Sequence, residues 1–366
     1  MCVTGCGSWE GVMSGWILPQ AELGPFLQTV REQMQVFAPT AVEAEGLCAL
    51  RPLNGAIGPP DTEARRTMLP PKKLLLPNNE TLFTFDAEGY HPAPVDDAPT
   101  VLFGLHPCDL RAISLLDRFF GARIADQRYV QRRAATRLIG ADCLPDDACF
   151  CHSVVASEPR DAVYDLFLWS LEDRFWVTVN GESGAALIDL DRKRFRHPRP
   201  ADRLALQRRQ QLRARMLENG RARRQARGDA QWSWREWSAA CFTCGACAMV
   251  CPTCVCTTQE EHPSLDGASG ERVRRWSACL YQNYDRAAGE HHFRNERMER
   301  ARNRFEHKML GCGVGEEGVK CVGCGRCVVN CPAQLPLGEA LERAAGNLQR
   351  AQAIKAAAAN PGGEES

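Results

Sequence analysis

The stretch CFTCGACAMVCPTCVC, residues 241–256, contains six cysteines among sixteen residues. Four of them follow the spacing C-x2-C-x2-C-x3-C-P, and the same spacing returns in CVGCGRCVVNCP at 321–332. Two such runs indicate two [4Fe-4S] clusters, because three closely spaced thiolates can bind one face of a cubane. The fourth cysteine of each run usually ligates the other cluster. The sequence therefore predicts two cysteine-ligated sites, each of which takes three ligands from one run and its fourth ligand from the other run.

The crossed fourth ligand assigns the cysteines of the two runs to two sites. The first site comprises Cys241, Cys244, Cys247 and Cys331. The second site comprises Cys321, Cys324, Cys327 and Cys251. Glycines inside the loops permit a positive φ and close backbone approach, so that amide N–H groups can point at sulfur; these are Gly245, Gly323 and Gly325.

Disulfides and zinc are the other interpretations of so many cysteines. The start of the chain lacks a basic segment and an unbroken apolar run, so it does not resemble a signal peptide. We expect a soluble, cytoplasmic protein, in which disulfides are rare. Zinc sites close at four ligands and would leave several of these thiols unused. Iron–sulfur clusters therefore explain the spacing better than either alternative.

Length and charge narrow the other possibilities. A chain of 366 residues is expected to form about two domains. Its 45 basic and 45 acidic residues balance, so overall charge favours neither a nucleic-acid nor a membrane partner. No Walker motif, zinc-protease helix or nucleophile elbow is visible. We assign no catalytic residues and no flavin-binding or nucleotide-binding residues.

Residues 1–200 have the pattern of an α/β domain. The apolar run TVLFGL at 100–105 suits a buried strand, and 109–120 has helical periodicity. Two further strands are expected around a polar turn at Glu172 and Asp173.

The rest of the chain is expected to be largely helical. Residues 201–238 form a basic linker helix with apolar residues at Leu204, Leu206, Leu212 and Met216. Its arginines are either a solvated face or a docking surface for an acidic partner. Residues 239–340 are predicted to be a mainly helical ferredoxin-like domain, with a helix at 296–310, and residues 341–366 a helix with a frayed tail.

The α/β half contains four more cysteines in two places. Cys108 lies in the loop HPCDL between the predicted strand and helix, a junction where α/β folds often bind ligands. The segment ADCLPDDACFCHS contributes Cys143, Cys149 and Cys151. These thiols are either buried and inert or the ligands of a third cluster.

The whole pattern resembles the beta subunit of cytoplasmic sulfhydrogenases and the iron–sulfur A component of anaerobic sulfite reductase. The resemblance rests on both cysteine runs and on WILPQAEL (16–23), LLLPNNETLFTF (74–85), FGLHPCDLRAISLLDRFF (103–120), CFC (149–151) and RVRRWSACLYQNYDRAAGE (272–290). Because it includes the PCD and CFC pieces, it favours the third cluster. One departure is Glu290, where a glycine is expected, and it bears on the shape of that loop.

The resemblance implies an electron-transfer subunit. Its expected partners are a flavin-containing, NAD(P)H-reactive subunit and a catalytic subunit, either a nickel–iron hydrogenase or a sulfite reductase. Two other classes stay open from the sequence: a self-sufficient flavin-containing iron–sulfur oxidoreductase and a zinc-binding nucleic-acid module. Cys254 and Cys279 match family positions and are either extra ligands or structural thiols. No role is assigned to Cys2, Cys6, Cys256 or Cys312.

Overall fold

The computed structural model describes residues 15–42, 47–53, 66–122, 124–154, 163–225, 234–310 and 320–341. Within these ranges, no helix is both long enough and apolar enough to cross a membrane. Cys2, Cys6 and Cys312 lie outside the described residues, as does the predicted helix and tail beyond residue 341.

The first half of the chain forms a seven-stranded mixed sheet in the order β1-β9-β8-β7-β6-β2-β3. The inner strands β2, β6, β7 and β8 are parallel, and the remaining pairs are antiparallel. The strands are β1 (Gly15–Pro19), β2 (Gln35–Ala41), β3 (Cys48–Pro52), β6 (Thr100–Leu105), β7 (Thr136–Ala141), β8 (Leu166–Ser170) and β9 (Arg174–Val179). The predicted strand at 100–105 and the pair on either side of Glu172 are confirmed.

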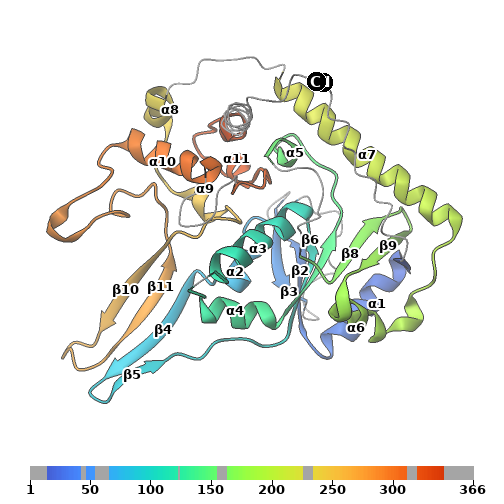
Figure 1. The fold of residues 1–366 in the computed structure, drawn as a ribbon, viewed down its shortest axis with the longest axis horizontal. Helices are drawn as coiled ribbons and strands as arrows, with labels where there is room; N and C mark the ends of the chain where they lie inside the picture. Colours follow the sequence, from blue (N-terminus) through green and yellow to red (C-terminus); the bar gives the residue numbers. More distant parts are fainter. Residues whose placement is uncertain are drawn as a thin grey trace, which may run out of the picture.

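Helices cover both faces of this sheet (Figure 1). Successive side chains of a strand point to opposite faces, so Val101 and Phe103 pack under α1 and α6, whereas Leu102 packs under α3. The helices of this half are α1 (Gln20–Arg31), α2 (Lys72–Leu75), α3 (Pro107–Phe120), α4 (Gln127–Ala134), α5 (Cys151–Val154) and α6 (Gly181–Asp189). The α/β prediction for the first half is therefore confirmed, including the helix after the strand at 100–105.

A second, four-stranded antiparallel sheet has the order β10-β11-β4-β5. It projects from the molecule as an arm (Figure 1). Its strands come from both halves of the chain: β4 (Asn79–Asp86) and β5 (Gly89–Pro92), then β10 (Thr257–Pro263) and β11 (Gly270–Trp276). The hairpin between the two cysteine runs was not predicted, since a mainly helical domain was expected there. The strands of this hairpin, β10 and β11, belong to a larger sheet because β4, which is distant in sequence, pairs with β11.

The cysteine runs themselves lie among short helices. These are α8 (Trp234–Ala240), α9 (Ala246–Met249), α10 (Arg297–Leu310) and α11 (Arg326–Val329). The predicted helix at 296–310 is thus confirmed as α10, which buries Ala301 and Phe305 against Trp237. The region mixes these helices with β10 and β11, so its expected helical character is found only in part.

The basic segment forms the long helix α7 (Pro200–Gln225). Its expected apolar stripe is wrong in two places, because Leu204 and Leu212 are 48% and 46% exposed. Leu206 packs against the core, as expected. Polar contacts also hold α7: Asp202 accepts from Arg174 at 2.7 Å, and Arg209 donates to Asp142 at 2.5 Å.

The loop with the unexpected Glu290 keeps a glycine-like backbone. Glu290 has φ +58° and Gly289 has φ +74°. A non-glycine residue adopts such a φ at some cost in free energy. Arg286 donates to the Glu290 carboxylate at 3.2 Å and so holds the residue in this conformation.

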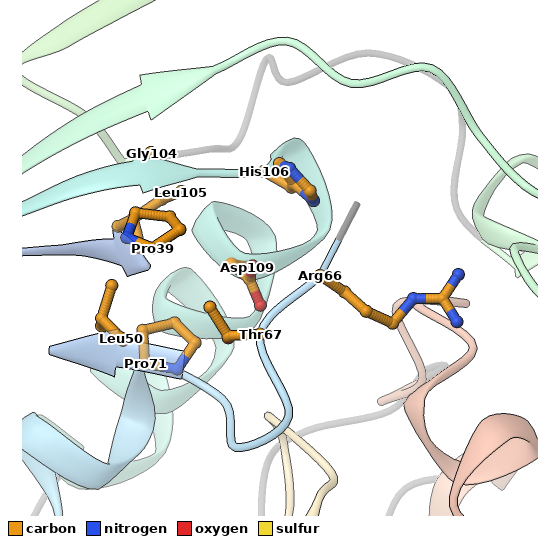
Figure 2. Close-up of a pocket in the computed structure, with 9 residues that line it drawn as sticks. All are labelled: Pro39, Leu50, Arg66, Thr67, Pro71, Gly104, Leu105, His106 and Asp109. Carbon is orange, nitrogen blue, oxygen red and sulfur yellow. The ribbon is translucent and has the colours of Figure 1, made fainter. Parts of the chain in front are cut away.

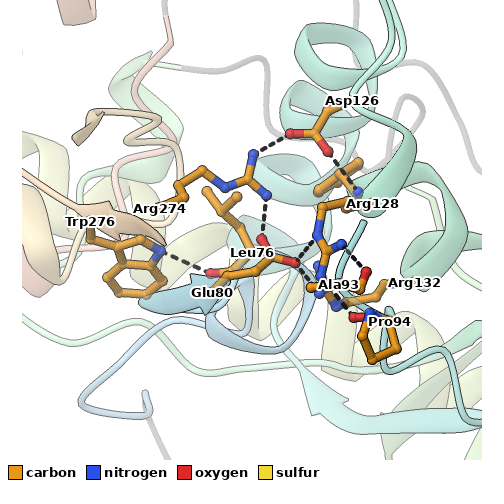
Figure 3. Close-up of polar contacts among 10 residues, drawn as sticks. Leu76, Glu80, Ala93, Pro94, Asp126, Arg128, Arg132, Arg274 and Trp276 are labelled. Atoms are coloured by element: carbon orange, nitrogen blue, oxygen red, sulfur yellow. Dashed lines mark hydrogen bonds and ion pairs between the residues drawn. The ribbon is translucent and has the colours of Figure 1, made fainter. Parts of the chain in front are cut away.

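Glu80 on β4 joins the arm to the seven-stranded sheet (Figure 3). Its buried carboxylate accepts hydrogen bonds from Arg128 at 2.7 Å, from Arg274 on β11 at 2.5 Å, and from Arg132. Burial opposes ionisation, but these three arginines outweigh it and lower the pKa of Glu80 to about 2. One carboxylate thereby connects β4, β11 and α4.

Arg326, inside the second cysteine run, is 1% exposed and connects the two halves of the chain. Its guanidinium donates to both carboxylate oxygens of Asp109, at 2.7 and 3.2 Å, in the first turn of α3. The same group donates to the carbonyl of Thr67 at 2.9 Å. A bidentate pair of this kind restricts both distance and orientation.

The loop that begins the second cysteine run packs directly on the segment around Cys151. Phe150 N–H donates to Gly323 O at 2.9 Å. Gly323 has φ +62°, and a Cβ atom there would lie 2.4 Å from the backbone nitrogen of Cys151. This close approach therefore requires glycine.

We predict that Glu80→Gln lowers the free energy of unfolding by about 3 kcal/mol, because it leaves buried arginines without their counter-charge. Glu261→Gln is the matched control, since Glu261 pairs with Arg272 on the exposed surface of the arm and is expected to lose less than about 1 kcal/mol. Urea denaturation followed by circular dichroism measures both. Equal losses in the two variants would contradict the central role of Glu80.

The same substitution should change the pH dependence of stability. The folded-state pKa of Glu80, about 2, lies below its ordinary value of 4.5. The stabilisation is therefore complete above about pH 4.5 and is lost as pH falls towards 2. The difference in urea midpoint between wild type and Glu80→Gln should shrink over that range, and a constant difference would argue against this origin.

We also predict that Gly323→Ala lowers the thermal midpoint by several degrees, because the added methyl group must push the loop away from Cys151. Gly267→Ala is a control for backbone strain alone: Gly267 has φ +71° but nothing lies within 4 Å of its Cβ position. If the two variants melt together, the close packing of Gly323 is not what stabilises this contact.

Candidate metal centres

The cysteines of the first predicted site line one pocket. Its walls include Cys241, Cys244, Cys247 and Cys331, together with apolar side chains such as Trp237, Leu280 and Leu335. The structure thus brings the three near cysteines of the first run together with the last cysteine of the second run. Cys244 is exposed, so this site lies close to the surface.

The two runs repeat one backbone design. Gly245 and Gly325 each precede a four-residue helix, with φ of +74° and +75°. In both runs an amide N–H two residues after the first cysteine contacts its sulfur at 3.4 Å: Thr243 to Cys241, and Gly323 to Cys321. Amide hydrogen bonds to sulfur help set the reduction potential of a cluster. The expected amide-to-sulfur contacts are therefore present.

Cys251 lies with the cysteines of the second run. Burial raises the pKa of Cys327 well above its ordinary value, and the neighbouring charges of Cys321, Cys324 and Cys251 add to this effect. Burial likewise raises the pKa of Cys321 to about 12, with contributions from Cys251 and Cys324. Thiols influence one another in this way only at short range. The arrangement supports the second predicted site.

The third group of thiols surrounds the first turn of α3. Burial raises the pKa of Cys108 well above its ordinary value, with smaller effects from Asp109, Cys324 and Cys143. Burial also raises the pKa of Cys143 to about 11 and of Cys149 to about 12, and Cys151 contributes to both. Cys324 connects this group to the second site, since it packs with Cys108.

Two residues beside Cys108 were not predicted as part of a site. The ligand atoms of His106, Cys108 and Asp109 lie within 4.8 Å of one another. Asp109 is already paired with Arg326. The sequence could have indicated this group, because His106, Cys108 and Asp109 all belong to the loop HPCDL. Only the fold shows that Asp109 is buried next to the Cys108 thiol.

A small pocket lies at the carboxyl ends of β2 and β6, and His106 and Asp109 form part of its lining (Figure 2). Its remaining walls are mostly apolar, with Pro39, Leu50 and Leu105. Arg66 reaches from this pocket to Asp146 and to the sulfur of Cys149, at 3.4 Å from the latter. The pocket therefore borders the third thiol group.

Buried cations face the thiols. Arg213 lies beside Cys143. Burial lowers the pKa of the Arg213 guanidinium, but the neighbouring thiols Cys143 and Cys151 outweigh this effect, so its pKa lies above the ordinary value. Lys72, Arg304 and Lys308 are 3–7% exposed. Each donates to a backbone carbonyl of 247–254: Lys72 to Cys254, Arg304 to Cys247 and Lys308 to Thr253, at 2.7–2.8 Å.

Among the described residues, no carboxylate pairs with Lys72, Arg304 or Lys308. Leaving an isolated charge buried costs several kcal/mol. Iron–sulfur clusters with four thiolate ligands are anions, and they would supply the missing negative charge. The chain's own cations therefore fit [4Fe-4S] clusters at these cysteines, whose chemistry is the transfer of single electrons.

Three further cysteines gather next to Cys251. Cys254, Cys256 and Cys279 are 4–8% exposed and pack with Ala248 and Ala278. Cys256 precedes β10 and its carbonyl accepts from Ser277 N–H at 2.9 Å, so the base of the hairpin holds these thiols together. These contacts bring Cys254 and Cys279, which the sequence left open as extra ligands or structural thiols, into one packed group beside Cys251.

Comparisons with known proteins agree with this geometry. Residues 240–335 match the family model of a 4Fe-4S dicluster domain. The chain is 30% identical over 282 residues to Sulfhydrogenase 2 subunit beta of Pyrococcus furiosus, covering 74% of this chain and 81% of that protein. The dicluster match favours iron–sulfur clusters over zinc. Because the identity extends over most of both chains, the protein belongs to the family of iron–sulfur electron-transfer subunits that includes the sulfhydrogenase beta subunit.

Proposed function

We propose that this chain relays electrons between a flavin-containing, NAD(P)H-reactive subunit and a terminal catalytic subunit of a cytoplasmic oxidoreductase. The catalytic subunit would be of the nickel–iron hydrogenase or the sulfite reductase type. The relative in Pyrococcus furiosus is named as a subunit of a sulfhydrogenase, and the subunit character of this chain follows by analogy.

One observation carries the proposal: the three thiol groups are contiguous. Cys247 of the first site neighbours Cys251 of the second, and Cys324 of the second packs with Cys108 of the third. The first site reaches the surface at Cys244. The third site lies next to α7, because Arg213 of that helix is beside Cys143. Such a row gives an electron an entry and an exit without needing a substrate pocket.

We assign two [4Fe-4S] clusters to the first and second sites and a third iron–sulfur cluster to Cys108, Cys143, Cys149 and Cys151. The proposed units are an α/β domain at 1–200, a linker helix at 201–238 and a cluster domain at 239–340. The chain's contribution is to hold the thiolates, to exclude water and to balance their charge. The cations at Arg66, Arg213 and Arg326 would do this for the third site, as Lys72, Arg304 and Lys308 do for the second.

The number of clusters can be measured by chemical analysis. Anaerobically reconstituted protein should contain about twelve iron and twelve sulfide if three cubanes are present, and about eight of each if only two are. Cys149→Ser should remove about four iron. Cys48→Ser is the matched control, because Cys48 is a cysteine on β3 that belongs to none of the three proposed sites. Unchanged iron in Cys149→Ser would remove the third cluster, and stoichiometric zinc without labile sulfide would end the iron–sulfur assignment.

The relay itself can be tested with the purified, reconstituted chain. It should exchange electrons with viologen dyes but should not oxidise NAD(P)H, measured as absorbance at 340 nm. Affinity purification from the native host should recover a flavoprotein and a catalytic metalloprotein. Robust NAD(P)H oxidation by the isolated chain, with flavin released on denaturation, would instead support a self-sufficient flavoenzyme.

A further inference from the structure

Thr253 and Lys308 form a buried contact with one cysteine ligand. The Thr253 hydroxyl oxygen lies 3.4 Å from the sulfur of Cys251. The Lys308 ammonium donates to the same hydroxyl oxygen and to the Thr253 carbonyl, both at 2.8 Å. Thr253 is 6% and Lys308 5% exposed, so water does not compete for these contacts.

The direction of these hydrogen bonds follows from the groups themselves. An ammonium group can only donate, whereas a hydroxyl can accept and also donate its single proton. Because the Thr253 oxygen accepts from Lys308, its proton is free to point at Cys251. The contact therefore runs as a chain of two hydrogen bonds from Lys308 to Thr253 and from Thr253 to sulfur.

The surroundings of Cys251 are also electropositive. Two buried cations hold the backbone on either side of this cysteine: Arg304 donates to the carbonyl of Cys247 at 2.7 Å, and Lys308 donates to the carbonyl of Thr253 at 2.8 Å. Positive charge is thus concentrated at the Cys251 end of the second site.

We propose that Thr253 and Lys308 are positioning residues that raise the reduction potential of the second site. The inference rests on the proposed relay function. Reduction adds negative charge to a cluster, so hydrogen bonds to its sulfurs and nearby cations favour the reduced form. The second site lies between the other two.

The repeated loop geometry is common to the two runs. The contacts of Thr253 and Lys308 are made at Cys251 in addition to that geometry.

The experiment is an EPR-monitored redox titration of the reconstituted full-length chain. The signal altered by Cys251→Ser identifies the second site. Thr253→Val keeps the shape of the side chain but removes the hydroxyl, and Thr253→Ser restores it. Lys308→Met removes the buried charge. Arg302→Met is the matched control on the same helix, because Arg302 is 60% exposed and pairs with Glu306.

Thr253→Val should lower the equilibrium constant for reduction of the second site about tenfold, or about 59 mV for one electron. Lys308→Met should shift it in the same direction by at least as much, whereas Thr253→Ser and Arg302→Met should titrate like wild type. The Fe–S(Cys) stretching band should also move to higher frequency in Thr253→Val.

A Thr253→Val protein with full iron content and an unchanged midpoint would overturn the inference, as would a shift confined to the first site. If Lys308→Met fails to incorporate iron, the Val and Ser variants of Thr253 still decide the question. A wild-type chain that binds no iron would instead overturn the proposed function, so the two failures are distinguishable.

Discussion

The structure depends on the buried ion pair between Arg326 and Asp109. Arg326 lies inside the second cysteine run, next to Cys324, and Asp109 directly follows Cys108. Their bidentate contact joins a ligand loop of the second site to the first turn of α3, and hence to the carboxyl end of β6. A buried pair of this kind adds little net stability but strongly restricts geometry. It holds the second and third thiol groups side by side.

Charge is the second constraint. Thiolates and iron–sulfur clusters are anionic, and the fold brings lysines and arginines from α2, α7, α10 and α11 to face them. Lys72, Arg304 and Lys308 also donate to carbonyls of 247–254, so the same groups shape the loop and balance its charge. The same side chains therefore place the ligand loop and supply positive charge beside it.

Local patterns predicted several elements correctly. The apolar run at 100–105, the periodicity at 109–120 and the apolar spacing at Ala301 and Phe305 each have a local cause, and each is found as expected. The arm was missed because β10 has few apolar residues and is ordered only by pairing with β11, which in turn pairs with β4. The stripe on α7 was wrong at Leu204 and Leu212, which are exposed, whereas Leu206 packs against the core and Asp202 and Arg209 add polar contacts.

The sequence by itself determined the chemistry of the sites. Spacing within a run dictates which cysteines can reach one cluster, because the chain between them is too short to separate them, and glycine at two fixed positions allows the turn. The rule that the fourth cysteine of each run ligates the other cluster also predicted that Cys331 joins the first run and Cys251 the second, and the structure places these thiols together. Only the tertiary structure decided that Cys108 lies beside Cys324. It also decided which cations face them. Lys72 and Lys308 look like ordinary surface residues in the sequence, and their role follows from burial beside sulfur without any carboxylate partner among the described residues.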